Sequence, residues 1–464
     1  MQFFGRKEEL NILYNAYSND SFESIIMYGR RRIGKSELIK KSYENINCKK
    51  IYFECFKASE ALNTEALSKR IGETFNIPTP NYKTLLEALD YVFSKSLEEK
   101  IILVIDEYPY LRGTNDYYDS VIQNVIDKYK MNAKIKFILC GSYIDMMLQI
   151  IEGDKPLYGR FTVKLNIKQM NYLESSLFYK NASLEDKVKY YSVFGGVPYY
   201  NQFIDDKLSV KENIINLISG PNARLLVEAE NFLSDEITKL NNANECFNAI
   251  AQGNRSFTDI LNKSHITSSP TLSDVLKKLI NMDVLEKVNP INDETEKKSS
   301  YIIKERLSLF YYKYIFLNKS YLKTMPADLF YDEFIFLDFE SQYVPKEFER
   351  IAIQYFELMN KNKLISPVLY KIGTFYYDDK KNRKNGEFDV VTLNKFGYDF
   401  YEVKFTKNPI DDSVVNEEKY QLNNLNIKYN KLGFISKSGF DITNSDEYNL
   451  ITLEDIYNIE IINK

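Results

Sequence analysis

The chain has 464 residues, a length typical of roughly three domains, and its formal net charge of -4 excludes a polycation that binds nucleic acid over its whole surface. Because it contains one histidine, His265, and four cysteines without a Cys-x-x-Cys pair, we expect neither a Ser-His-Asp triad nor a histidine-rich zinc site. Any chemistry must rest on carboxylates, lysine, arginine and bound metal. The lack of a signal core, and of an apolar run near the roughly 18 residues of a membrane span, predicts a cytoplasmic protein without membrane partners.

The first motif lies in residues 22–46, which predict a strand, a tight loop and a helix. Gly29 followed by Gly34, Lys35 and Ser36 has the Walker A spacing, in which loop N–H groups cradle phosphates. Lys35 would reach the β- and γ-phosphates of ATP, and the hydroxyl of Ser36 would hold Mg²⁺. The arginines of the loop fill variable positions and are weak evidence for nucleic acid. The predicted nucleotide-binding residues here are Gly29, Arg30, Arg31, Arg32, Ile33, Gly34, Lys35, Ser36 and Glu37.

Residues 100–111, KIILVIDEYPYL, predict a buried parallel strand that ends in Asp106 and Glu107. In open α/β sheets, nucleotide sites lie at the C-terminal ends of the strands. We therefore expect Asp106 to hold Mg²⁺ through water and Glu107 to orient the water that attacks the γ-phosphate. The alternative is an edge strand that ends in a solvated acidic turn.

Residues 134–147 predict a third strand, whose polar end at Gly141 and Ser142 would lie beside the γ-phosphate. Residues 156–161, PLYGRF, then supply Arg160. An arginine at this point would stabilise transition-state charge, either in cis or from a neighbouring subunit, which leaves a homo-oligomer open. The alternative for Arg160 is a surface or lid ion pair.

The ordered motifs FFGRKEEL, GRRRIGKSEL, VIDEYPYL, LCGSY and PLYGRF resemble a family of P-loop ATPases that is widespread in archaea and placed near the AAA+ and STAND groups. The resemblance covers about the first half of the chain. It implies that Phe4, Gly5 and Arg6 lie near the base and that Ser142 senses the γ-phosphate. It also implies that Pro198, in FGGVPYY, touches the adenine from a helical lid, whereas the local pattern alone indicates a helix stop and a turn.

The middle of the chain predicts two helical parts. Residues 1–170 would form the ATPase core and 171–235 the lid, followed by a winged helix-turn-helix over 236–325. The last is indicated by three short helices and two strands around a polar wing. Its third helix would expose Ser273, Lys277 and Lys278, with Lys297 and Lys298 in the wing. Such domains bind DNA or serve as protein-contact modules, and both alternatives stay open here.

Residues 326–464 are expected to form a third α/β domain, in which residues 385–405 predict a β-hairpin. Because residues two apart in a strand share a face, Glu402 and Lys404 point the same way, and Asp389 on the partner strand can reach the same spot. Two carboxylates beside a lysine suit bound Mg²⁺ and a polarised water. The alternative is a pair of amphipathic strands with salt-bridged surface charges.

This arrangement resembles the PD-(D/E)xK nuclease superfamily, with Phe388 where the family name has proline. The resemblance implies that Asp389, Glu402 and the helix residue Glu349 are metal ligands and that Lys404 activates or steers the nucleophile. The basic residues Lys380, Lys381, Arg383 and Lys384 would hold a phosphate backbone nearby.

Together these features predict an α/β protein: a P-loop AAA+-like ATPase with a helical lid, a winged helix-turn-helix and a restriction-endonuclease-like domain. ATP and Mg²⁺ are the expected cofactors. The nucleotide state would be coupled to binding or metal-dependent cleavage of DNA or RNA. The alternatives are a nucleotide-driven interaction switch and a transcription regulator, both with an inactive nuclease-like domain. A processive helicase is disfavoured because no further helicase motif follows residue 111.

Overall fold

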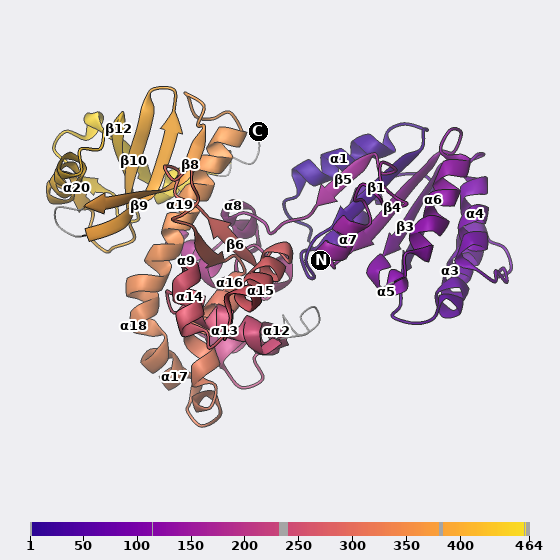
Figure 1. Cartoon of the computed structure of the whole chain (residues 1–464), viewed down its shortest axis with the longest axis horizontal. Helices are drawn as coiled ribbons and strands as arrows, with labels where there is room; N and C mark the ends of the chain where they lie inside the picture. The colour runs from indigo at the N-terminus through magenta and orange to yellow at the C-terminus, as the bar shows by residue number, and fades with distance from the viewer. Residues whose placement is uncertain (1, 114, 232–239, 380–383, 459, 461–464) are drawn as a thin grey trace. The chain divides into compact units, whose positions relative to one another are not determined.

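The computed structural model describes residues 2–113, 115–231, 240–379, 384–458 and 460, in two compact units, 1–169 and 170–464 (Figure 1). The first unit ends one residue before the position expected for the end of the ATPase core. The expected lid, winged helix and third domain all fall within the second unit, and their separation into domains stays a prediction. Lys380, Lys381 and Arg383 lie outside the described residues.

The first unit is a five-stranded parallel sheet with the strand order β2-β3-β4-β1-β5. Its strands are β1 (Glu23–Tyr28), β2 (Lys49–Glu54), β3 (Ile101–Asp106), β4 (Ile135–Gly141) and β5 (Val163–Asn166). Its helices are α1 (Lys7–Tyr17), α2 (Lys35–Tyr43), α3 (Glu60–Phe75), α4 (Leu85–Lys95), α5 (Tyr108–Arg112), α6 (Tyr117–Tyr129) and α7 (Ile144–Gln149). Every residue of β3 and of β4 is buried. The continuous apolar sequence of β3 predicts this for a strand covered on both faces, whereas β4 contains Lys136, whose ammonium donates to Asn19 and to the carbonyl of Ser21.

The second unit begins with short helices in the region expected to be a lid. They are α8 (Tyr172–Ser175), α9 (Leu184–Phe194), α10 (Pro198–Asn201), α11 (Val210–Ile214) and α12 (Arg224–Asn231). Gly196 lets this region pack closely, because a Cβ at that position would lie 1.8 Å from the carbonyl oxygen of Met170. Only glycine therefore fits the contact between the two backbones.

Three helices and a two-stranded antiparallel sheet follow, in the succession that the sequence predicts. They are α13 (Leu240–Ala251), α14 (Phe257–Lys263), α15 (Ser269–Asn281), β6 (Leu285–Val288) and β7 (Ser300–Ile303). The apolar face predicted for the third helix is confirmed in α15, since Leu272, Val275, Leu276 and Leu279 are all buried. The helix begins at a Ser268 cap whose hydroxyl accepts a hydrogen bond from the N–H of Thr271.

The C-terminal part combines a helical connection with a second five-stranded sheet, in the order β14-β12-β10-β9-β8 (Figure 1). The helices are α16 (Arg306–Phe310), α17 (Ala327–Phe334), α18 (Phe336–Asp338), α19 (Val344–Lys361), α20 (Asp412–Asn424) and α21 (Leu453–Ile456). The strands are β8 (Lys371–Asp379), β9 (Lys384–Asn394), β10 (Gly397–Lys404), β12 (Lys431–Ser436) and β14 (Asn449–Thr452), with a separate pair β11 (Ile410–Asp411) and β13 (Phe440–Asp441). Strands β9 and β10 form the predicted antiparallel hairpin, whereas β10, β12 and β14 run parallel.

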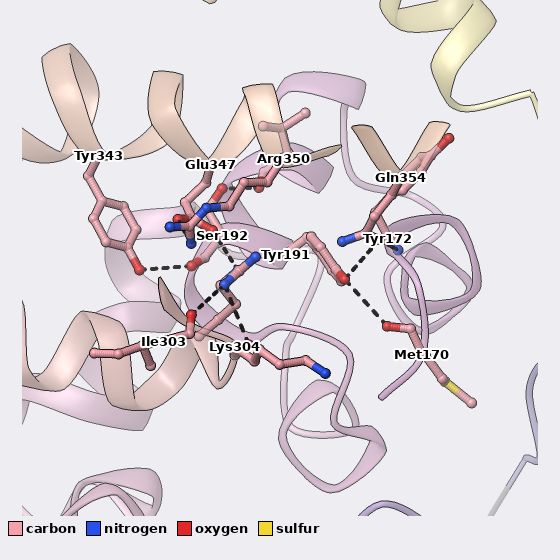
Figure 2. A network of polar contacts seen from close by, with 12 residues as sticks. Met170, Tyr172, Tyr191, Ser192, Ile303, Lys304, Tyr343, Glu347, Arg350 and Gln354 are labelled. Carbon is pink, nitrogen blue, oxygen red and sulfur yellow. Dashed lines mark hydrogen bonds and ion pairs between the residues drawn. The ribbon is translucent and has the colours of Figure 1, made fainter. Parts of the chain in front are cut away.

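A buried ion cluster joins three parts of the second unit, as Figure 2 shows. Glu347 of α19 accepts a hydrogen bond of 2.7 Å from Arg350 and forms an ion pair of 2.5 Å with Arg306, the first residue of α16. Arg306 also donates to the carbonyl of Ile303 in β7 over 2.8 Å. Tyr343, just before α19, donates to the carbonyl of Ser192 in α9. These contacts tie α9, α16 and α19 together.

The segment between β6 and β7 packs against the edge strand β8. The N–H of Ile291 donates to the carbonyl of Thr374 over 2.8 Å, and the side chain of Asn292 bonds both backbone groups of Tyr376. Lys298 donates to the hydroxyl of Tyr376 and lies 4.4 Å from the centre of its ring. The predicted wing therefore covers a sheet edge, which would otherwise present unpaired backbone groups.

Candidate functional site

The loop between β1 and α2 has the shape that a phosphate cradle needs. Gly34 adopts a φ of 90° immediately before α2, a left-handed conformation that glycine allows at little cost. Gly29 has no room for a side chain, because a Cβ would lie 2.3 Å from the carbonyl oxygen of Ile167. Helix α2 starts at Lys35, so its N-terminal N–H groups face the loop.

Lys35 is buried, and its ammonium group lies inside the loop. Its Nζ donates to the carbonyl oxygens of Gly29 over 2.8 Å and of Arg30 over 2.9 Å. The loop thus holds a buried ammonium group at the start of α2, and its contact with phosphate stays a prediction.

Ser36 and Asp106 meet at the C-terminal end of the sheet, although strand β4 separates β1 from β3. The hydroxyl of Ser36 donates to Oδ2 of Asp106 over 2.8 Å. The hydroxyl of Tyr52, at the end of β2, donates to the same oxygen, and Oδ1 accepts the N–H of Glu107 over 2.9 Å. Burial, followed by the charge of Asp106, raises the pKa of Tyr52 well above its ordinary value, so its hydroxyl stays protonated as a donor. Tyr52 was not predicted, because nothing in its local pattern shows which carboxylate it faces.

Glu107 and Ser142 form a second pair beside the first. Glu107 has a φ of 47° at the start of α5, and this turn directs its carboxylate toward the end of β4. Its Oε2 accepts a hydrogen bond of 2.8 Å from the Ser142 hydroxyl and one of 3.2 Å from the Ser142 N–H. The predicted water-orienting residue and the predicted γ-phosphate sensor are therefore neighbours.

The N-terminal segment predicted to lie near the base is bound to this loop. Gly5 and Arg6 both have positive φ, and Arg6 is buried. The Arg6 guanidinium donates to the carbonyls of Ile33 over 3.2 Å and of Lys168 over 2.6 Å. This fixes the segment that contains Phe4 against the phosphate loop, while its contact with a base stays a prediction.

Two further side chains of the loop have partners other than phosphate. The guanidinium of Arg31 donates to the hydroxyls of Tyr110 over 2.6 Å and Tyr143 over 3.0 Å. The carboxylate of Glu37 is exposed and pairs with Lys40 over 3.3 Å. Any role of these two residues in holding phosphate therefore rests on their backbone N–H groups.

Arg160 lies where strand β1 begins, at the end of the sheet opposite to the phosphate loop. Its carbonyl accepts a hydrogen bond from Ser24 at the start of β1, whereas the loop follows the end of that strand. Its guanidinium pairs with Asp127 over 2.9 Å near the solvent. The surface ion pair, which the sequence left open as the alternative, is the arrangement found, and a role of Arg160 in cis stays a prediction. A role across subunits stays a proposal.

Pro198 belongs to the second unit, where it is the first residue of α10. The rigid ring of proline suits this position, because the first N–H of a helix has no partner within the helix. Its predicted contact with adenine stays a prediction.

The C-terminal carboxylates predicted as a site gather around two lysines. The Nζ of Lys346 lies 2.5 Å from Glu349 and 2.8 Å from Asp389, and Lys404 forms an ion pair with Glu402. Burial, followed by the charge of Asp389, raises the pKa of Glu349 to about 8. The pKa of Glu402 is also raised, mainly by burial. The charge of Lys404 opposes this shift, and the charge of Asp389 adds to it. The four predicted residues thus share one electrostatic environment.

These carboxylates are not arranged as a ligand set. Within the described ranges, no group of three or more histidine, cysteine, aspartate or glutamate side chains could hold a metal ion. Ammonium groups of Lys346 and Lys404 instead contact oxygens of Glu349, Asp389 and Glu402. In this structure the three carboxylates are therefore paired with lysines, and their role as metal ligands stays a prediction.

Sequence reasoning missed two members of the cluster. Lys346 stands three residues before Glu349 on α19, so helical spacing alone would have placed it on the same face. Glu418 lies on α20, and burial followed by the charge of Glu402 raises its pKa to about 8. The adjacent acidic residues of α20 were a signal, but only the packing shows which strand they face.

The residues expected to contact DNA have different surroundings. Ser273, Lys277 and Lys278 are exposed on α15, as predicted. Lys297 is exposed in the wing, whereas Lys298 is held by Tyr376. His265 is also exposed, 3.2 Å from Glu245, as expected of a surface histidine. None of the helices in the described part is long and apolar enough to span a membrane.

Comparison with known proteins finds matches for both units of the chain. Residues 3–201 match a family described as an ATPase domain predominantly from Archaea. Residues 311–422 match a family of archaeal and bacterial proteins of unknown function. The Walker-type ATPase PABY2304 of Pyrococcus abyssi covers 67% of this chain and is covered over 96% of its own, at 18% identity and a TM-score of 0.49.

Two proteins of Methanocaldococcus jannaschii are similar in sequence. The ATP-binding protein MJ0423 is 44% identical over 55 residues, which are 12% of this chain and 93% of that protein. The uncharacterized protein MJECL04 is 30% identical over 394 residues, which are 84% of each chain. Residues 3–201 of this chain match the archaeal ATPase domain, and the chain as a whole belongs to the same family as MJECL04.

Proposed function

We propose that this protein binds and hydrolyses ATP at the C-terminal end of the first unit's sheet. The observation that carries the proposal is the 2.8 Å hydrogen bond between Ser36 and Asp106, beside the pair of Glu107 and Ser142. It joins groups from three separate strand ends in the arrangement that phosphoryl transfer requires. The ATPase family match and the ATP-binding relative MJ0423 support the same activity.

Each residue of the site has a role in this proposal. The N–H groups of residues 29–36 and the ammonium of Lys35 bind the phosphates. The oxygens of Ser36 and Asp106 fit Mg²⁺, which when bound neutralises charge on the β- and γ-phosphates. Glu107 orients a water for attack on the γ-phosphate, and Ser142 reports its presence by changing its bond to Glu107.

Lys35→Ala is expected to weaken the binding of Mg-ATP by about two orders of magnitude, because a buried charge that pairs with phosphate is removed. Isothermal titration with a non-hydrolysable ATP analogue measures this loss. Lys41→Ala is the matched control, since Lys41 is an exposed lysine of the same helix that pairs with Glu44. Equal affinity of wild type and Lys35→Ala would overturn the assignment of the phosphate loop.

We further propose that the nucleotide state controls contact between the second unit and nucleic acid. The helices α13–α15 with the sheet β6–β7 have the order of a winged helix-turn-helix, and α15 exposes Lys277 and Lys278. The carboxylates around Lys346 and Lys404 are the candidate for a nuclease-like site, although their present arrangement favours an inactive scaffold. In that case the protein is a nucleotide-driven interaction switch or a transcription regulator.

Incubation of DNA and RNA with the protein in Mg²⁺ or Mn²⁺ separates these alternatives. Cleavage that is lost in Asp389→Ala, but kept in Asp446→Ala, would establish the nuclease; the control removes an exposed aspartate of the same sheet region. From the lysine-filled arrangement we expect no cleavage. Sequence-specific DNA binding that survives Glu402→Ala would instead support a regulator acting through the winged helix.

A further inference from the structure

A hollow lies at the open edge of the first unit's sheet, where β2 is the outermost strand. Its volume is about 480 Å³, within the range of roughly 300–1,000 Å³ that holds a ligand or a peptide side chain. Tyr52 and Glu54 of β2 form one wall, Lys40 of α2 a second, and Ala66 and Lys69 of α3 a third. Helix α3 also contributes Arg70 and Glu73. Lys69, Arg70 and Glu73 stand three, four and seven positions after Ala66, so the four residues lie on one face of the helix.

The backbone of β2 presents unused hydrogen-bonding groups at this hollow. The N–H of Cys55 donates to the carbonyl of Asp106, so odd-numbered residues of this strand face β3. Since backbone groups alternate along a strand, those of Tyr52 and Glu54 point outward. No described residue bonds the N–H or the carbonyl of either one, whereas the outward carbonyl of Lys50 is contacted by Thr74. The outer side of β2 is therefore covered at Lys50 and open at Tyr52 and Glu54.

The rim of the hollow carries positive charge and apolar surface. Lys40, Lys69 and Arg70 line it, against Glu54 and Glu73; Lys40 already pairs with Glu37 over 3.3 Å and Arg70 with Glu73 over 3.0 Å. Lys69 forms no ion pair with any residue that the structure describes. The ring of Phe56, also in the lining, is 49% exposed and gives the hollow an apolar side.

The same hollow is connected to the nucleotide site through one side chain. Lys40 lies 5.6 Å from the centre of the Tyr52 ring, and the hydroxyl of that ring is bonded to Asp106. An occupant that shifts this ring would change the bond to the carboxylate that faces Ser36.

We propose that the hollow binds an extended, acidic segment of a partner protein, which adds as a strand to the open end of β2. The outward groups of Tyr52 and Glu54 supply main-chain hydrogen bonds, the hollow takes one apolar side chain, and Lys69 pairs with an acidic neighbour of that side chain. Binding tightens or loosens the Tyr52–Asp106 bond and thereby alters ATP turnover. This goes beyond the proposed hydrolysis, since the segment binds whether or not the site is active.

A displayed library of random short peptides, selected on the full chain, tests the proposal. We expect enrichment of acidic peptides with one apolar residue, and a loss of affinity of about tenfold or more in Lys69→Glu and in Ala66→Trp, which fills the hollow. Lys83→Glu, an exposed lysine outside the hollow, is the matched control. In an enriched peptide that binds as a strand, every second backbone N–H faces β2. N-methylation of those nitrogens should abolish binding, whereas N-methylation of the nitrogens between them should leave it unchanged.

The coupling has its own readout. Tyr52→Phe keeps the ring but not the hydroxyl, so an enriched peptide should still bind while its effect on ATP turnover disappears. The proposal is overturned if no peptide prefers wild type over Ala66→Trp, if basic peptides bind equally well, or if neither of the two N-methylations changes affinity. Binding of free phosphate or ATP in the hollow, blocked by Lys69→Glu, would also overturn it in favour of a small-anion site.

Discussion

Glu107→Gln is expected to bind ATP within about twofold of wild type and to hydrolyse it about 10²–10³ times more slowly. Glutamine keeps an oxygen that can accept the hydrogen bond from Ser142, so the local structure is retained. It carries no negative charge, however, and cannot orient or deprotonate a water as a carboxylate does. Single-turnover hydrolysis of radiolabelled ATP, beside equilibrium binding of the same nucleotide, separates the two effects.

Two variants control this experiment. Glu54→Gln makes the same chemical change at the end of the neighbouring strand β2 and should leave turnover nearly unaltered. Ser142→Ala removes the donor but keeps the carboxylate, so we expect an intermediate loss of about tenfold. If Glu107→Gln turns over ATP at a rate similar to Glu54→Gln, the water-orienting role belongs to another residue.

Glu347→Gln is expected to destabilise the second unit by about 3–5 kcal/mol, a large share of the roughly 5–15 kcal/mol that holds a typical domain together. Glu347 is 3% exposed and is the carboxylate that both Arg306 and Arg350 contact. Figure 2 shows Glu347 beside Arg350. Burial already lowers the pKa of Arg350 to about 10, with Glu347 opposing that shift and Arg306 adding to it. Without the carboxylate, two buried guanidinium groups would face each other.

Native-state hydrogen exchange of α9, α16 and α19 measures this loss locally, which avoids treating a chain of two units as one transition. Exchange in the first unit should stay unchanged. Asp332→Asn, which removes an exposed ion pair with Lys211, should cost less than about 1 kcal/mol. Replacing Glu347 and both arginines together by apolar residues should recover most of the loss. A cost below about 1 kcal/mol for Glu347→Gln would mean that solvent reaches the cluster.

Local sequence was enough to predict the elements that carry the candidate nucleotide site. The positions of Gly29 and Gly34 follow from backbone conformations and close contacts that only glycine allows, and the start of α2 fixes Lys35 beside them. The apolar run before Asp106 predicts a strand buried on both faces. Its C-terminal end lies where open α/β sheets in general bind nucleotides. The hairpin of β9 and β10 follows in the same way from alternation and a turn.

Side-chain partners across the sheet could not be predicted, because they depend on strand order and packing. Arg160 follows the other motifs in sequence, yet it lies just before β5, at the end of the sheet opposite to the loop. Its guanidinium therefore forms an ion pair with Asp127. Tyr52 reaches Asp106 only because β2 lies next to β3. Lys346 forms ion pairs with both Glu349 and Asp389, and no local pattern around Asp389 shows that this lysine is near.

The sequence by itself therefore predicted the glycine loop before Lys35, the acidic strand end at Asp106 and Glu107, the polar strand end at Ser142 and the hairpin of β9 and β10, since each depends on conformational limits and periodicity within a short segment. The tertiary structure alone decided which charges neutralise one another, which edge of the sheet stays open and where the wing packs. Those properties arise from contacts between residues that are distant in the chain, and no local pattern encodes their partners.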